Sequence, residues 1–415
     1  MPLNQLEIEN TLSTPNLKIY EGAMLKNLNY HNLGMFSWNP KKDGYIEYDQ
    51  DPPTLRDIDF LNDKLSHSPV DFINDLEVSN HSIDITKPPY GYCYAVPLHI
   101  AQEYGCDLKK IDFLLSGAIL AALCNGSYDY NSKFILVQVR NGIIILRSMQ
   151  TKPYTLNDVG HQFEKFVTND ANTMEKDASI STLREISLGR FRLLINAEVD
   201  AIDEDGELCE VKLNPFMKTT VLLQGDKDYP QDQKPITIGK RICAQLIGNG
   251  SRMLISSESE WWKEQDKKTK CRLIRINRHS MEEVIRKVDQ LSQDFGNKET
   301  IDDILGHAHE ALISLKDGVA TGRIKSDPDD FYELEIRKTV GVIQKNYIIV
   351  KRLNKDRLEA TSELYLQELY ELLDASKAQK DLFLQKMVEL NSLFSENVRK
   401  HEETNIQEFK DKGRL

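Results

Sequence analysis

The chain has 415 residues, of which 40% are hydrophobic and 28% charged, and its formal net charge is −12. This composition is typical of a globular protein with a large core, and the acidic balance argues against a broad basic surface for long duplex nucleic acid. No apolar stretch approaches the length of a membrane span, and from the polar start at Met1 we expect no signal peptide. We therefore expect an intracellular protein, in the nucleus, the cytoplasm or both.

The first third of the chain is polar and then becomes apolar. Residues 1–30 predict a polar amino-terminal arm that is loosely held. A helix is expected around residues 55–64. The mostly apolar segment 107–123 predicts a second, buried helix.

Strand and helix signals are mixed in the middle of the chain. Residues 134–139 and 143–146 are apolar and flank Arg140-Asn141-Gly142, which predicts a β-hairpin. Further helices are expected at 162–167, 241–247, 281–293 and 301–315, and further strands at 191–195, 253–255, 272–276, 331–334 and 347–350. Because there is no strict βαβ alternation, we predict an α/β fold in which one domain, residues 31–355, forms a mixed β-sheet sandwich flanked by helices.

The last segment, residues 356–415, predicts a long helical carboxyl-terminal extension. Residues 361–401 contain no Gly or Pro, and their apolar residues recur at spacings of three and four. Two interpretations stay open. The segment is either an amphipathic helix or helical hairpin that packs back on the core, or an extension that binds a protein partner.

The most informative stretch is acidic. Residues 197–201 and 209–212 alternate apolar and charged side chains, which is the period of a β-strand. This period places Glu198 and Asp200 on one face of a strand, and Glu210 and Lys212 on one face of the next. The turn residues of 203–207 join them, so we predict a hairpin with three carboxylates and one ammonium in a single patch.

Such a patch suits a hard divalent cation. Mg²⁺ and Mn²⁺ prefer carboxylate and carbonyl oxygens, and phosphodiester hydrolysis commonly depends on such cations. The alternative is an ordinary edge hairpin whose charged side chains face water.

Three motifs in this order resemble the DXO-type family of RNA decapping enzymes and 5′-end exoribonucleases. They are Gly-x-x-Phe-Glu at 160–164, Glu-Val-Asp at 198–200 and Glu-Val-Lys at 210–212. Segments 32–38, 51–53 and 241–245 also look like parts of that family. The resemblance extends over roughly residues 30–330 and is dilute between the motifs.

The resemblance implies a role for each motif residue. The side chains of Glu164, Glu198, Asp200 and Glu210, together with the carbonyl oxygen of Val211, would surround one or two Mg²⁺ or Mn²⁺ ions.

Two further residues complete the implied catalytic set. Lys212 would orient the attacking water and offset negative charge in the transition state, a role that we prefer to general base. Gln245 would hydrogen-bond the water or the scissile phosphate, although a helix residue bonded to backbone is an equal alternative. Asn249-Gly250 predicts a turn and not a phosphate-binding loop.

One departure from the family concerns Ser116. The family carries Trp-Arg-Gly before its first core helix, and its Arg contacts RNA phosphate, whereas Ser116 stands there in this chain. A Ser cannot make the bidentate, charge-assisted contact of an Arg. We expect a weaker grip on RNA or a narrower set of 5′ ends, unless Arg147 on a following strand replaces the charge.

These observations predict a divalent-metal-dependent hydrolase that acts on RNA 5′ ends in RNA quality control. Its reactions would be decapping, pyrophosphate release and 5′-to-3′ exonuclease cleavage. The alternative is a catalytically weakened protein of the same fold that binds RNA 5′ ends or acts as a scaffold. A DNA endonuclease is a third class, disfavoured by the acidic net charge.

Overall fold

A computed structural model of the whole chain provides the structure. It describes residues 9–12, 24–39, 45–48, 52–74, 95–125, 133–150, 159–169, 179–213, 235–263, 269–294, 299–326, 330, 332–338 and 346–352. The predicted carboxyl-terminal extension, including residues 361–401, lies outside the described residues.

Among the described residues, ten strands form the larger of two sheets. In spatial order they are β1 (Glu9–Leu12), β17 (Asn346–Arg352), β16 (Tyr332–Lys338), β7 (Lys133–Arg140), β8 (Ile143–Gln150), β6 (Phe113–Ser116), β11 (Phe191–Glu198), β10 (Ser179–Leu188), β2 (Asn29–Asn39) and β3 (Tyr45–Tyr48). β6 runs parallel to both β8 and β11, whereas the other neighbours are antiparallel. The sheet is therefore mixed, as predicted.

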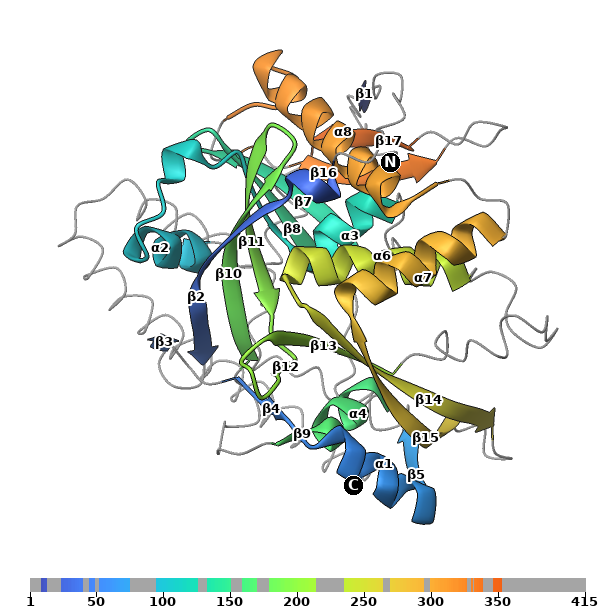
Figure 1. Cartoon of the computed structure of the whole chain (residues 1–415). Coiled ribbons are helices and arrows are strands. Elements are labelled where there is room, and N and C mark those ends of the chain that lie inside the picture. Colours follow the sequence, from blue (N-terminus) through green and yellow to red (C-terminus); the bar gives the residue numbers. More distant parts are fainter. Residues whose placement is uncertain are drawn as a thin grey trace, which may run out of the picture.

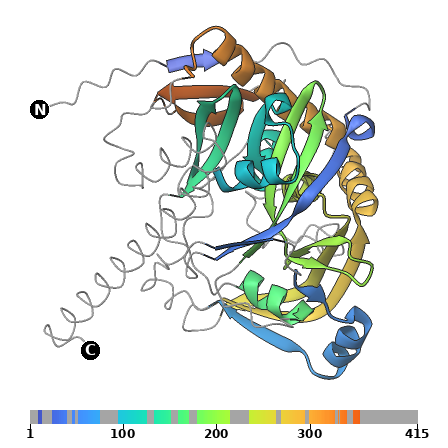
Figure 2. The same ribbon diagram turned by 90° about the vertical axis from the view of Figure 1, so that its left-hand side faces the viewer.

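Seven strands form the smaller sheet. Their order is β5 (Val70–Asn74), β15 (Thr269–Ser280), β14 (Met253–Lys263), β13 (Leu208–Lys212), β12 (Ala201–Ile202), β4 (Thr54–Leu55) and β9 (Thr168–Asn169). The larger sheet occupies the upper part of Figure 1 and the smaller sheet the lower part, and the β12–β13 hairpin is the part of the smaller sheet that lies next to β10 and β11 (Figures 1 and 2).

Helices cover both faces of the larger sheet. The described helices are α1 (Ile58–His67), α2 (Ala95–Glu103), α3 (Gly117–Asn125), α4 (Val159–Val167), α6 (Pro235–Asn249), α7 (Met281–Asp294) and α8 (Ile301–Ala320). One core joins the sheet to α3, α6, α7 and α8, and a second core on the other face includes residues of α2. A third core joins the smaller sheet to α1 and α4. Figure 1 shows this separation of the helices.

The prediction of one helix over residues 107–123 is wrong in its first half. Phe113–Ser116 form strand β6, and the helix α3 begins only at Gly117. Leu115 packs into one core and Leu114 into the other, so both faces of β6 are buried. A strand that is buried on both faces is a continuous apolar run, and such a run has no period that separates it from a buried helix.

The other predicted elements are present with shifted ends. The hairpin of β7 and β8 turns through Asn141 and Gly142, whose φ angles are 49° and 82°. Positive φ at both turn positions matches a type I′ turn, for which Asn-Gly is the preferred pair. Of the predicted amino-terminal arm, residues 9–12 pair with β17, and residues 29 and 30 begin β2.

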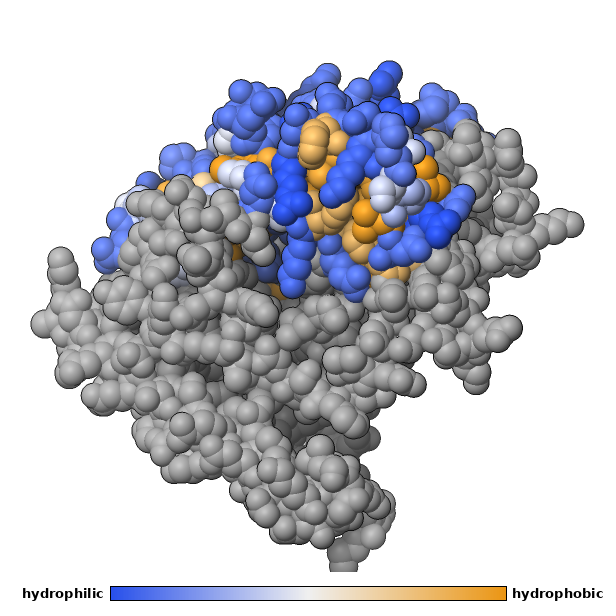
Figure 3. All heavy atoms as spheres, turned by 90° about the horizontal axis from the view of Figure 1, so that it is seen from below, coloured by the Kyte–Doolittle hydropathy of each residue, from blue (hydrophilic) through white to orange (hydrophobic). Residues whose placement is uncertain are grey.

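The surface seen from below combines hydrophobic and hydrophilic residues. Hydrophobic residues gather within a frame of hydrophilic ones over the described part of this face (Figure 3). Among the large hydrophobic side chains that the structure describes, Phe60 of α1 and Ile274 of β15 are exposed by 65% and 43%.

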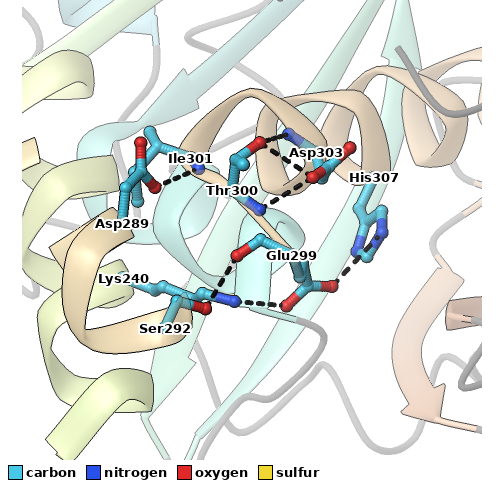
Figure 4. Close-up of polar contacts among 8 residues, drawn as sticks. All are labelled: Lys240, Asp289, Ser292, Glu299, Thr300, Ile301, Asp303 and His307. Atoms are coloured by element: carbon cyan, nitrogen blue, oxygen red, sulfur yellow. Dashed lines mark hydrogen bonds and ion pairs between the residues drawn. The ribbon is translucent and has the colours of Figure 1, made fainter. Parts of the chain in front are cut away.

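A buried polar cluster joins α6, α7 and α8 (Figure 4). We call it the Lys240 cluster. Lys240 Nζ donates a hydrogen bond to Glu299 Oε2 at 2.6 Å, and His307 Nε2 lies 3.5 Å from Glu299 Oε1. Ser292 Oγ donates to the carbonyl oxygen of Glu299 at 2.9 Å. The cluster thus ties the end of α7 and the start of α8 to the first turns of α6.

The start of α8 is capped within the same cluster. Thr300 and Asp303 form a capping box, in which each side chain accepts a hydrogen bond from the backbone N–H of the other residue. Asp289 Oδ1 of α7 accepts a further hydrogen bond from Ile301 N at 2.9 Å. Three backbone donors that the helix itself leaves unpaired are thereby satisfied.

Candidate active site

The acidic segment crosses from one sheet to the other. Glu198 is the last residue of β11 in the larger sheet, and Val199 N still donates to Ile180 O at 2.9 Å. The chain then enters β12 of the smaller sheet at Ala201. The prediction that Glu198 and Asp200 share the face of one strand is therefore wrong. A pattern with period two does not reveal where a strand changes sheets.

β13 orients its side chains as its sequence predicts. Cys209 and Val211 are buried in the core shared with α1 and α4. Because successive side chains alternate across a strand, Glu210 and Lys212 leave the opposite face. The β12–β13 hairpin is confirmed by the pairing of Ala201 with Cys209.

Asp200, Glu210 and Lys212 converge on one point. Lys212 Nζ lies 2.7 Å from Glu210 Oε1 and 3.3 Å from Asp200 Oδ2. It also donates to the carbonyl oxygen of Val211 at 3.1 Å, and Val211 N donates to Asp200 Oδ2 at 2.8 Å. One ammonium is thus surrounded by three oxygens of different origin. We call this arrangement the Lys212 cluster.

The acidic groups and the ammonium of the Lys212 cluster change one another's pKa. Burial raises the pKa of Asp200, the charge of Lys212 lowers it, and the charges of Glu210 and Glu164 raise it further. Burial alone would lower the pKa of Lys212, but Asp200 and Glu210, with Glu164, raise it above its usual value. Lys212 is therefore held as an ammonium, and the net effect on Asp200 is to raise the pKa of its carboxyl group to about 8.

The remaining predicted residues differ in their distance from this cluster. Glu164 on α4 is half-buried and close enough for its charge to act on both Asp200 and Lys212. Glu198 is exposed, and no described hydrogen bond or ion pair joins it to the cluster. Gln245 is half-buried on α6.

Asn249 is a neighbour that the sequence analysis did not assign to the site. Its Nδ2 donates to Glu210 Oε2 at 2.7 Å. Asn249 is the last residue of α6, and Gly250 follows with a φ of 65°, so the predicted turn is present. Gln245 lies one helical turn earlier, which places both amides on the same side of α6. That spacing was the available signal.

The donor atoms of the Lys212 cluster fit a hard divalent cation. One carboxylate oxygen of Asp200, one of Glu210 and the carbonyl oxygen of Val211 all lie within 3.3 Å of Lys212 Nζ. These are oxygen donors of the kind that Mg²⁺ and Mn²⁺ prefer. Across the part of the chain that the structure describes, no three His, Cys, Asp or Glu side chains are grouped closely enough to hold a metal. A cation at this point would therefore depend on the Val211 carbonyl as well.

Ser116 and Arg147 lie on neighbouring strands. Ser116 ends β6, and its Oγ accepts a hydrogen bond from Ile119 N at 3.3 Å, which caps α3. Arg147 of β8 is fully buried, and its Nη2 donates to Gln138 Oε1 at 3.1 Å. The last pair that joins β6 to β8 is Leu114 with Ile145. Ser116 and Arg147 each lie two residues further, so they leave the same face of the sheet at the same level.

The sequence itself matches no family model and no curated protein. Three solved yeast structures are similar in three dimensions. S. pombe Rai1 in complex with 3′-FADP is 16% identical, with a TM-score of 0.51, over 84% of this chain and 100% of that chain. Scheffersomyces stipitis Rai1 in complex with (3′-NADP)+ and calcium ion is 13% identical, with a TM-score of 0.51, over 88% and 98%. Candida albicans Rai1 in complex with pU5-Mn2+ is 11% identical, with a TM-score of 0.50, over 83% and 95%.

At such identities the likeness concerns the fold. It extends over nearly the whole length of each Rai1 chain, and it agrees with the resemblance of the sequence motifs to the DXO-type family. No described helix is long and apolar enough to cross a membrane. The chain has the fold of the Rai1 structures.

Proposed function

We propose that this protein is a divalent-metal-dependent hydrolase that acts on RNA 5′ ends. The observation that carries the proposal is the convergence of Asp200, Glu210 and the Val211 carbonyl on a single cationic group. Its reactions would be decapping, release of pyrophosphate and 5′-to-3′ exonuclease cleavage. The role would be quality control of RNA ends.

Each residue has a distinct task in this proposal. Asp200, Glu210 and the Val211 carbonyl, with Glu164 and Glu198, would hold one or two Mg²⁺ or Mn²⁺ ions. When bound, such an ion polarises the scissile phosphate and lowers the pKa of a coordinated water.

The protein's own polar groups do the rest. Lys212, which is held protonated, would stabilise negative charge on the reacting phosphate and would not serve as a base. Gln245 would orient the phosphate or the water from α6.

The three compared complexes support the choice of ligand. The Candida albicans protein holds pU5 with Mn2+, the Scheffersomyces stipitis protein (3′-NADP)+ with calcium, and the S. pombe protein 3′-FADP. These ligands combine a nucleotide with phosphate groups, and two of them accompany a divalent cation. An RNA 5′ end offers the same chemistry.

The test is incubation of the full chain with RNAs that carry a 5′ monophosphate, a triphosphate, an unmethylated cap or an NAD end. Each is incubated with Mn²⁺ and, separately, with a chelator. We expect product from at least one RNA only with Mn²⁺, and the preferred end identifies the reaction. Absence of product from all four would overturn the proposal.

A second candidate is a protein that binds RNA 5′ ends without cleaving them. Ser116 favours it, because the hydroxyl is engaged in capping α3 and carries no charge for phosphate. Thermal unfolding separates the two candidates. A catalytic metal site gains stability with Mn²⁺ by mass action, whereas a degenerate site does not.

A further inference from the structure

The two oxygens of the Glu210 carboxylate have different partners. Oε1 faces Lys212, at 2.7 Å, and Oε2 accepts the hydrogen bond from Asn249 Nδ2, also at 2.7 Å. Glu210 is only 3% exposed, so water does not readily replace either partner. The carboxylate is therefore fixed in rotation, with one oxygen turned to the cationic centre and the other away from it.

Asn249 is itself confined from the other side. A methyl group on Gly117, the first residue of α3, would overlap Asn249 Oδ1. A methyl group on Gly248 would lie 3.1 Å from the Cα of Gly117. Two glycines thus allow α3 and α6 to approach so closely that the amide of Asn249 fills the space between Gly117 and Glu210. Its orientation follows from the hydrogen bond, because only the NH₂ end can donate to a carboxylate.

The end of α6 holds the backbone of Asn249 in place. Gly250 N donates to Ile247 O at 3.2 Å, and Ser251 N donates to Leu246 O at 2.9 Å. With the positive φ of Gly250, these bonds form a tight helix end directly after Asn249. The amide is therefore presented from a rigid position.

We propose that Asn249 is a positioning residue that orients Glu210 for cation binding, and that Gly117 locks it in place. The inference rests on the proposed function and adds a residue to the site. By holding Oε2, Asn249 aims Oε1 at the point shared with Asp200 and the Val211 carbonyl. Partners that orient metal ligands commonly change metal affinity or activity by about 10- to 100-fold.

The direct test replaces Asn249 with Leu, which keeps a similar branched volume but cannot donate a hydrogen bond. Calorimetric titration of the full chain with Mn²⁺ measures the affinity. We expect Asn249→Leu to weaken Mn²⁺ binding about tenfold or more. On the RNA that wild type prefers, kcat should fall while KM for RNA stays nearly unchanged, because a positioning residue acts through Glu210 and not by contact with the RNA.

A second variant reaches the same contact from the other side. Gly117→Ala places a methyl group where Asn249 Oδ1 lies, so it displaces the amide from its position against Glu210 and leaves every charged residue in place. We expect it to weaken Mn²⁺ binding as Asn249→Leu does, and the double variant to be no weaker than either single one. If the loss of Mn²⁺ affinity in the double variant equals the product of the two single losses, the two residues act independently and the shared mechanism is contradicted.

Asn62 offers a matched control. Its side chain bonds both the N–H and the carbonyl of Ile276, at 2.8 and 2.9 Å, between α1 and β15. Asn62→Leu should lower stability without changing Mn²⁺ affinity. If Asn249→Leu binds Mn²⁺ as wild type does, or if Asn62→Leu weakens binding equally, the inference is overturned.

The wild-type protein separates this failure from failure of the proposed function. A wild type that neither binds Mn²⁺ nor processes any RNA overturns both statements. A wild type that does both, next to an Asn249→Leu variant that does both equally well, overturns the positioning role alone.

Discussion

Two lysines that face carboxylates show how differently one type of contact is used in this molecule. Lys240 faces one carboxylate, Glu299, at 2.6 Å, and its side chain is 4% exposed. Lys212 faces two carboxylates, and its side chain is 30% exposed. The ammonium of Lys240 faces one carboxylate in a contact that joins helices, whereas the ammonium of Lys212 is shared by two acidic side chains and lies where two sheets meet. The number of acidic side chains that share the ammonium, together with the exposure of the lysine, separates the structural pair from the candidate catalytic one.

The largest expected effect is on activity at the Lys212 cluster. Asp200→Ala and Glu210→Ala each remove one of the oxygens that converge on the cationic centre. We expect RNA 5′-end turnover to fall by about 100-fold or more, because metal-assisted charge stabilisation amounts to several kcal/mol. Turnover assays with Mn²⁺ check this, with circular dichroism to confirm folding. Full activity in both variants would refute the assigned site.

Lys212→Met separates charge stabilisation from cation binding. We expect turnover to fall by about 100-fold, as when one preorganised donor is removed from an active site. Mn²⁺ affinity should not fall, because the ammonium and the cation draw on the same oxygens. The two quantities are measured by single-turnover kinetics and by calorimetry. A variant that loses Mn²⁺ binding together with turnover would assign Lys212 a structural role.

Glu299→Ala should show the opposite behaviour. It leaves the buried ammonium of Lys240 without its carboxylate, so we expect the free energy of unfolding to fall by about 2–3 kcal/mol. The value lies below that of a fully buried pair, because the Glu299 side chain is 31% exposed. Mn²⁺ affinity and turnover of the folded variant should match wild type. Denaturant unfolding measures the stability. A loss of Mn²⁺ binding would contradict a purely structural role for the Lys240 cluster.

The smallest expected effect concerns Asp289 at the edge of the Lys240 cluster. Burial raises the pKa of this carboxyl. Stability from a raised carboxyl pKa is complete below the unfolded-state pKa of about 4 and is lost as pH rises through the folded-state pKa. Asp289→Asn keeps an oxygen acceptor for Ile301 N and should gain less than about 1 kcal/mol at pH 7. Unfolding curves at pH 4 and pH 7 test this, and an equal gain at both would argue against titration.

Much of this architecture could be predicted from local sequence patterns. The Asn141-Gly142 turn and the alternation through Glu210 and Lys212 are decided by residues that are neighbours in the chain, so the local sequence predicted both. β6 was misread because both of its faces are buried. The break between Glu198 and Asp200 is a property of how two sheets meet, which no local pattern contains.

The candidate site shows the same limit. The motifs predicted Asp200, Glu210 and Lys212, which the structure brings together. Asn249 escaped attention because its role depends on Gly117, which lies 132 positions earlier in the chain. The spacing of four residues from Gln245 indicates which side of α6 Asn249 occupies, but the contact with Gly117 joins two helix ends that are far apart in the chain and has no such spacing.

The crossing of the acidic segment has a mechanical consequence. Val199 N donates a hydrogen bond to Ile180 O of the larger sheet, whereas Ile202 already pairs with Leu208 of the smaller sheet, so the chain changes sheets within a few residues around Asp200. Rocking one sheet against the other would change the separation between Glu198 and Glu210 directly. The distance between these carboxylates would then depend on the angle between the sheets. A molecule that binds both sheets at once, far from the carboxylates, would change this distance by changing the angle.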